Sequence, residues 1–120
     1  MPSFVKKEFD SNTKTTTFYY SQTDQDTFEA DVDNFFVSEA YRLVEGDKGN
    51  GVYEKGDRTL RLLLGAFYKY FKFRTHIEFN GKGDAKLSLI KATSGVSGGA
   101  IGVSQVKKEL TRLVEKLETL

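Results

Sequence analysis

The densest hydrophobic pattern in the chain lies at residues 58–79, and its second half alternates with a period of two. In residues 71–79, FKFRTHIEF, four aromatic or aliphatic side chains and one threonine occupy every second position, and polar residues occupy the positions between them. This period is typical of a strand with one buried and one exposed face. We therefore predict a strand whose phenylalanine side faces the core.

Similar patterns predict strands on both sides of this segment. Leucines alternate at residues 60–64, and the glycine-rich turn at residues 80–84 leads into a return strand, which together predict an antiparallel meander. Residues 13–20, TKTTTFYY, are rich in the β-branched and aromatic residues that favour strands. The predicted strands are residues 4–9, 13–20, 41–44, 52–55, 60–64, 71–79 and 85–89.

Two segments have helical spacing instead. In the first, Asp26 and Glu29 are placed as a capping pair, and apolar residues follow at i, i+4, i+7 and i+8. This apolar stripe consists of Phe28, Val32, Phe35 and Phe36. In the second, apolar residues repeat with spacings of 4, 3, 4 and 3. The second stripe consists of Val106, Leu110, Leu113, Leu117 and Leu120.

Length and composition indicate one soluble domain. A chain of 120 residues with 38% hydrophobic and 29% charged residues suits a single globular domain spanning residues 1–120. There is no cysteine, which excludes disulfides and thiolate ligands and fits a reducing compartment. The N-terminal residues lack the apolar region of a signal peptide, and no apolar run is long enough to span a bilayer. We therefore predict a cytoplasmic protein.

The net charge of +1 conceals two halves of opposite charge. Residues 1–57 carry 6 basic and 12 acidic residues (net −6), whereas residues 58–120 carry 12 and 5 (net +7). Such asymmetry can mark a partner surface, or it can reflect two solvated halves that face each other. The acidic cluster at residues 24–33 lacks the spacing of a calcium loop, and its position at a helix start explains it without a metal.

A glycine-rich segment, TSGVSGGAIG, precedes the second helical stripe. Backbone N–H groups before a helix can bind an anion, so this loop is a candidate anion site. Its spacing matches neither a dinucleotide fingerprint nor a P-loop, which favours a flexible crossover onto the sheet. The candidate residues are Gly95, Gly98, Gly99 and Gly102.

Aromatic and basic residues alternate in the segment Phe67–Arg74. This pattern suits base stacking with phosphate contacts, or an anionic membrane surface, but it is also what an ordinary strand with a phenylalanine core side would show. Tyr68 and Tyr70 share the parity of Lys72 and Arg74 and so would be exposed in a regular strand. The candidate binding residues are Tyr68, Lys69, Tyr70, Lys72 and Arg74.

Catalytic side chains are sparse. His76 is the single histidine, and it shares a strand face with Glu78, which could orient the imidazole. The sequence places no nucleophile beside this pair. Most reaction templates need a larger constellation, so an enzyme is the third alternative, and we predict neither a cofactor nor a metal.

The order of strand, helix, strands and long C-terminal helix resembles the helix-grip architecture of the Bet v 1 and START-like families. The Gly46–Gly51 turn, between the first two strands after the helix, is similar in placement to the glycine-rich loop of Bet v 1 proteins. The smaller TATA-binding-protein-like arrangement has the same order with fewer strands. The resemblance implies a curved antiparallel sheet that wraps the last helix.

We predict a single α+β domain in which two helices cover one face of an antiparallel sheet of about five to seven strands. The leading functional hypothesis is a non-catalytic binding module for an amphiphilic ligand or a protein partner. A ligand pocket between the last helix and the sheet would require that this space is not filled by the core. The alternative is a surface that binds nucleic acid or another polyanion, or an anionic membrane, through the basic aromatic segment.

Overall fold

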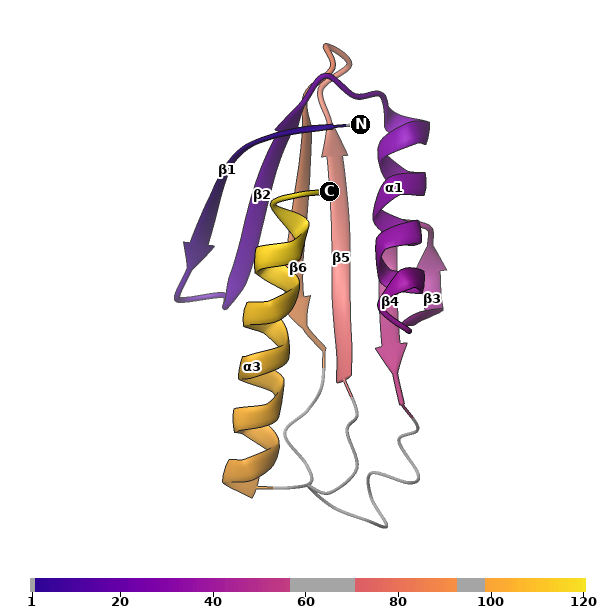
Figure 1. The fold of residues 1–120 in the computed structure, drawn as a ribbon. Helices are drawn as coiled ribbons and strands as arrows, with labels where there is room; N and C mark the ends of the chain where they lie inside the picture. The colour runs from indigo at the N-terminus through magenta and orange to yellow at the C-terminus, as the bar shows by residue number, and fades with distance from the viewer. Residues whose placement is uncertain (1, 57–70, 93–98) are drawn as a thin grey trace.

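The computed structural model describes residues 2–56, 71–92 and 99–120, and within this part six strands and two helices are present (Figure 1). No helix among these residues has the length and apolar character needed to cross a membrane. The elements are β1 (Ser3–Asp10), β2 (Thr15–Ser21), α1 (Gln25–Ser38), β3 (Arg42–Asp47), β4 (Asn50–Lys55), β5 (Phe71–Phe79), β6 (Ala85–Lys91) and α3 (Gly99–Leu117).

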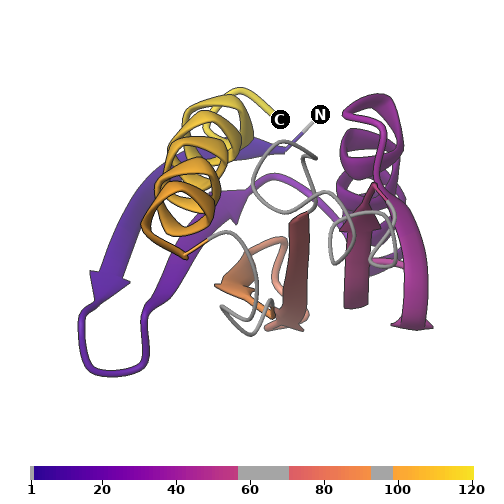
Figure 2. The same cartoon turned by 90° about the horizontal axis from the view of Figure 1, so that it is seen from below.

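The strands form one antiparallel sheet in the order β1-β2-β6-β5-β4-β3. The pairing of β2 with β6 brings the N-terminal hairpin beside the last strand of the chain. Both helices lie on the same side of the curved sheet (Figure 2). The predicted α+β class, with two helices on one face of the sheet, is therefore confirmed.

One predicted strand pairing is wrong. The predicted meander placed β5 between the leucine segment 60–64 and β6. In the structure β4, not the leucine segment, pairs with β5, and Tyr53 lies opposite Phe73. Val52 and Tyr53 are both fully buried, so β4 has apolar residues on both faces and suits an inner strand. The leucine segment itself lies outside the described residues.

The core lies between the sheet and the helices, as the alternation predicts. In β5, Phe71, Phe73 and Thr75 are buried and Arg74 is exposed. Ala85, Leu87 and Leu89 of β6 are buried in the same way. The largest buried side chains opposite them are Phe28, Val32 and Phe36 of α1 and Leu113 and Leu117 of α3.

Helix α1 begins two residues earlier than the capping pair predicted. The N-cap is Asp24, whose carboxylate accepts hydrogen bonds of 2.9 Å from the backbone N–H and from the hydroxyl of Thr27. These bonds lower the pKa of Asp24. Asp26 is instead a residue of the first turn. Asp24 and Asp26 both have capping chemistry, and only the Thr27 contact decides between them.

Helix α3 begins at Gly99, seven residues before the predicted apolar stripe. The predicted stripe is confirmed: Leu113 and Leu117 are fully buried, and Val106, Leu110 and Leu120 pack partly against the core. The sequence predicted a flexible crossover at residues 93–102 because small residues let the chain leave the sheet, but glycine costs only about 1 kcal/mol in a helix relative to alanine. This difference is small enough for Gly99 and Gly102 to be helical.

The two outer strands are both irregular. In β1 the ladder shifts register between Phe4 and Lys6, and in β3 it shifts between Leu43 and Glu45. The extra residues, Val5 and Val44, are 59% and 44% exposed. Bulges of this kind are typical of sheet edges, where they limit uncontrolled pairing with other chains.

Candidate functional site

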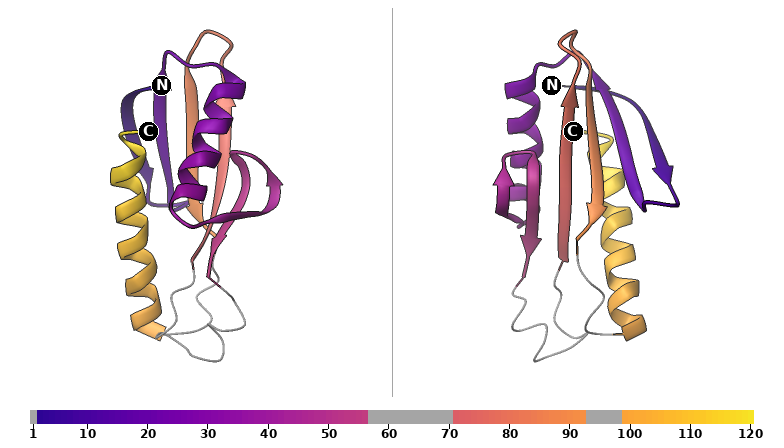
Figure 3. Two further views of the ribbon diagram at one scale, coloured as in Figure 1. Left: turned by 45° about the vertical axis from the view of Figure 1, so that its right-hand side comes forward. Right: turned by 180° about the vertical axis from the view of Figure 1, so that it is seen from behind.

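The face of the sheet opposite the helices, which we call the outward face, carries two polar cross-strand rows and a third row in which an arginine lies between two apolar residues. Figure 3 (right) shows this face with α3 behind the sheet. Paired residues in adjacent antiparallel strands point to the same face, so the register defines the rows. The rows are Tyr19–Lys86–Glu78, Thr17–Ser88–His76 and Ile90–Arg74–Val52.

The two predicted binding residues that the structure describes, Lys72 and Arg74, do lie on this face. Lys72 is opposite Glu54, whose carboxylate also forms an ion pair with Arg42. Arg74 is exposed, between Val52 and Ile90. The cations of β5 therefore share the face with a carboxylate. Tyr68, Lys69 and Tyr70 lie outside the described residues.

The candidate anion loop is only partly described. Gly95 and Gly98 lie outside the described residues. Gly99 is the first residue of α3, and Gly102 is within its first turn. The prediction of a loop is therefore wrong for these two glycines, although anion binding at the segment stays untested.

A pocket of about 470 Å³ opens at the end of the outward face, where β1, β2, β5 and β6 meet the β5–β6 turn. We call it the outward pocket. Its lining includes Val5 and Tyr19 as apolar surface, Lys6 and Lys86 as cations, and Glu78 and Asp84 as carboxylates.

The β5–β6 turn that borders the outward pocket is held by hydrogen bonds. The side-chain oxygen of Asn80 accepts a bond of 2.8 Å from the N–H of Lys82, and the Asn80 amide donates to Asp84 at 3.0 Å. The N–H of Thr23 donates to the carbonyl of Gly83 at 3.1 Å. The rim of the pocket is therefore tied to the segment between β2 and α1.

Tyr19 is one of the aromatic residues that line the outward pocket. The Lys6 ammonium lies 4.8 Å from its ring centre, and its hydroxyl donates a hydrogen bond of 3.2 Å to Glu8. Lys6 and Glu8 also form an ion pair at 3.2 Å. The hydrogen bonds from Lys6 and Tyr19 lower the pKa of Glu8 below its ordinary value of 4.5. These contacts hold a cation and a carboxylate at the β1 side of the pocket.

A second ion pair lies on the other side of the pocket. The Lys86 ammonium is 3.4 Å from one oxygen of Glu78, and His76 Nε2 is 3.6 Å from the other. The Lys86 and Glu78 side chains are both more than a third exposed, so their ion pair is weak and its charges stay available to a ligand.

The predicted proximity of His76 and Glu78 is confirmed by this 3.6 Å distance. Ser88 lies directly opposite His76 in the ladder, but no hydrogen bond joins these two described side chains. A nucleophile needs a hydrogen-bonded base, so the arrangement does not form a catalytic triad. Within the described ranges, no group of three or more acidic residues or histidines is placed to hold a metal ion.

The sequence did not predict the outward pocket. Its residues come from four strands and a turn, and they meet only because β2 pairs with β6. The sequence contained one relevant signal, the alternation of side chains along each strand. Tyr19 and Lys86 alternate with the core residues Phe18 and Leu87, which predicts that they are exposed but not that they lie close to each other.

Comparison of the chain with protein-family models, with curated proteins and with solved structures finds no match. The resemblance to helix-grip or TATA-binding-protein-like folds therefore rests on the order of elements alone. The cytoplasmic location likewise stays a prediction.

Proposed function

We propose that the protein is a non-catalytic binding module that takes an amphiphilic small ligand in the outward pocket. The observation that supports this is the combination of volume and lining: about 470 Å³, with a tyrosine ring and a valine beside two ammonium groups. Small-molecule sites are usually apolar hollows of about 300–1,000 Å³ that contain a few polar groups.

The lining favours a ligand with a flat apolar body and an anionic group. The apolar body would lie on Tyr19 and Val5, and the anionic group would be bound by Lys86 or Lys6. Both ammonium groups are already paired with exposed carboxylates. Exposed ion pairs contribute only about 0–1 kcal/mol, so an anionic ligand can replace the carboxylate at small cost.

The space between α3 and the sheet is the other place where a ligand could bind. Where this space is lined by described residues, their packing supports placing the ligand on the outward face instead. Leu113 and Leu117 of α3 and Leu87 of β6 are fully buried there. The hydroxyl of Tyr20 donates a hydrogen bond of 2.5 Å to the carbonyl of Leu117, which fixes the end of α3 on the sheet. This part of the space is filled by the protein's own core.

The experiment is an NMR titration of the ¹⁵N-labelled protein with the anionic amphiphile 8-anilinonaphthalene-1-sulfonate. We expect saturable amide shifts at Tyr19, Lys86 and the β5–β6 turn. Tyr19→Thr should abolish saturation, since threonine keeps the strand propensity but removes the ring. Lys86→Ser should weaken binding, whereas Lys48→Ser, on the exposed β3–β4 turn, should not.

Well-dispersed spectra of each variant are the control, because this dye also binds partly unfolded chains. Shifts spread over the whole molecule, or equal binding by wild type and Tyr19→Thr, would remove the outward pocket as the site.

A further inference from the structure

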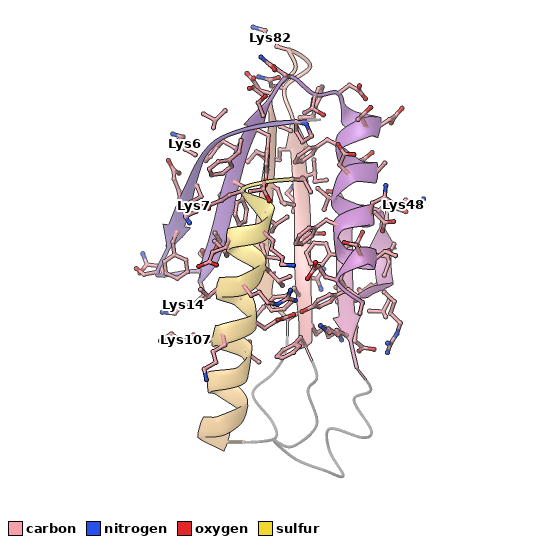
Figure 4. All side chains as sticks on the ribbon, viewed as in Figure 1. Lys6, Lys7, Lys14, Lys48, Lys82 and Lys107 are labelled. Carbon is pink, nitrogen blue, oxygen red and sulfur yellow. The ribbon has the colours of Figure 1, made fainter. Side chains whose placement is uncertain are left out.

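The outer edge of β1 has features that suit pairing with another strand. β1 is the first strand of the sheet, so one side of its backbone has no neighbouring strand among the described elements. Its side chains include Val5 and Phe9, which are 59% and 60% exposed. Figure 4 shows Lys6 and Lys7 on this strand. An exposed edge of this kind is a template for an additional strand.

The sequence of β1 is complementary to itself in the antiparallel direction. The residues around Lys7 read Val5, Lys6, Lys7, Glu8 and Phe9. If two copies pair with Lys7 on the two-fold axis, Lys6 of each copy lies opposite Glu8 of the other. A two-fold axis produces this contact twice, giving two ion pairs. We propose that the protein forms a homodimer through β1 in this register.

The faces of the sheet agree with this register. Lys6 pairs with Tyr19 and Glu8 pairs with Thr17, which are both residues of the outward face. The proposed partners therefore point to the same side, and the sheet continues from one copy into the other with all helices on one side. A shift of one residue would pair side chains from opposite faces. A shift of the axis to Lys6 or Glu8 would place that charge against itself.

The like charges on the axis are already compensated. Lys7 faces the helix side, where its ammonium is 2.5 Å from Glu118, the residue after α3. The intrastrand pair between Lys6 and Glu8, at 3.2 Å, is 57% and 56% exposed and can exchange for the pair between copies. The bulge at Val5 limits the ladder to a few residues, so the dimer should be weak and concentration-dependent.

The experiment uses sedimentation velocity of the full chain across the micromolar to millimolar range. We expect the average mass of the wild type to rise with concentration. Lys6→Glu and Glu8→Lys should each weaken association by about tenfold, because two attractive cross-strand pairs become repulsive. An equimolar mixture of the two variants should associate as well as the wild type, because every glutamate then meets a lysine.

The matched control is Lys48→Glu, which makes the same change of charge at an exposed turn on the far side of the sheet and should leave association unchanged. A wild type that stays monomeric, or a mixture that associates no better than its components, would overturn the proposal. Lys6 also lines the outward pocket, so association is measured without the dye, and the pocket is tested separately through Tyr19 and Lys86.

Discussion

The hydroxyl of Tyr41 donates a 2.6 Å hydrogen bond to Oε2 of Glu109, and so joins the segment between α1 and β3 to the middle of α3. Both residues are buried, at 3% and 7% exposure. Arg112 donates to both oxygens of the same carboxylate at 2.8 Å and also contacts Glu39. Glu39 also pairs with Lys116 at 3.2 Å. This network fixes α3 relative to the end of α1.

The first prediction concerns the acid stability that Glu109 provides. Burial tends to raise its pKa, but the hydrogen bonds from Arg112 and Tyr41 outweigh burial, and the pKa lies below the ordinary 4.5. A carboxyl with a lowered folded-state pKa stabilises the protein above the unfolded-state pKa, and this contribution is lost as pH falls through the folded-state value. Glu109→Gln should therefore be less stable at neutral pH by about 1–3 kcal/mol.

The measurement for Glu109→Gln is urea unfolding at about pH 7 and about pH 3, where the linkage differs most. The variant should lose less stability on acidification than the wild type. Equal losses in the two proteins would show that Glu109 does not carry this acid dependence.

The second prediction concerns the buried stripe of α3. Leu113 has no exposed surface, so Leu113→Ala should reduce the free energy of unfolding by about 2–5 kcal/mol. Leu110 lies on the same helix but is only partly buried, so Leu110→Ala is the matched control and should cost less. Chemical denaturation followed by circular dichroism measures both. An unchanged midpoint for Leu113→Ala would show that this half of α3 does not pack as described.

The predictable parts of the fold are those that depend on local periodicity. In β5, the face of each residue follows from alternation, and Phe71, Phe73 and Arg74 lie as predicted. The sequence was less informative where two nearby residues can both cap a helix, as with Asp24 and Asp26 at the start of α1.

The parts that could not be predicted depend on contacts between distant residues. Tyr41 and Glu109 are 68 positions apart, and nothing near either residue marks it as a partner of the other. The pairing of β4 with β5 likewise depends on distant contacts, because several predicted strands have a similar pattern and could pair with β5. Register and strand order are set by the whole core rather than by any one segment.

The third prediction compares two glycines with nearly the same positive φ angle. Gly49 has φ +78° and is buried, and a Cβ there would lie 2.5 Å from Cδ1 of Ile77. Its carbonyl accepts a 2.8 Å hydrogen bond from the hydroxyl of Thr75. Gly81 has φ +77° and is exposed, with no atom within 4 Å of an added Cβ.

Alanine at either position would adopt a similar positive φ, so the difference in stability between the two variants measures the steric contacts of the added Cβ at Gly49. Gly81→Ala should cost about 1–2 kcal/mol for the left-handed conformation alone. Gly49→Ala should cost at least about 1 kcal/mol more, since Ile77 or the turn must move. Denaturation midpoints of the two variants give the comparison. Similar values would mean that the β3–β4 turn adjusts freely over β5.

The fourth prediction tests the alternative function, in which the basic aromatic segment binds a polyanion or an anionic membrane. Lys72 lies opposite Glu54 and Lys86 is paired with Glu78, so these two cations of the face are close to carboxylates, whereas Arg74 lies between Val52 and Ile90. Such a face gives little net attraction to phosphate at physiological ionic strength. We therefore expect the wild type to bind neither single-stranded DNA nor phosphatidylserine vesicles under those conditions.

Fluorescence anisotropy and vesicle co-sedimentation, at low and physiological salt, measure this binding. The decisive comparison is between two triple variants with the same change of charge: Lys69→Glu, Lys72→Glu, Arg74→Glu on the segment, and Lys48→Glu, Lys107→Glu, Lys108→Glu at exposed positions elsewhere. Salt-sensitive binding that the first variant loses and the second keeps, with both folded, would contradict our expectation. The sheet face would then be a polyanion surface, because only the position of the charges, and not their number, distinguishes the two proteins.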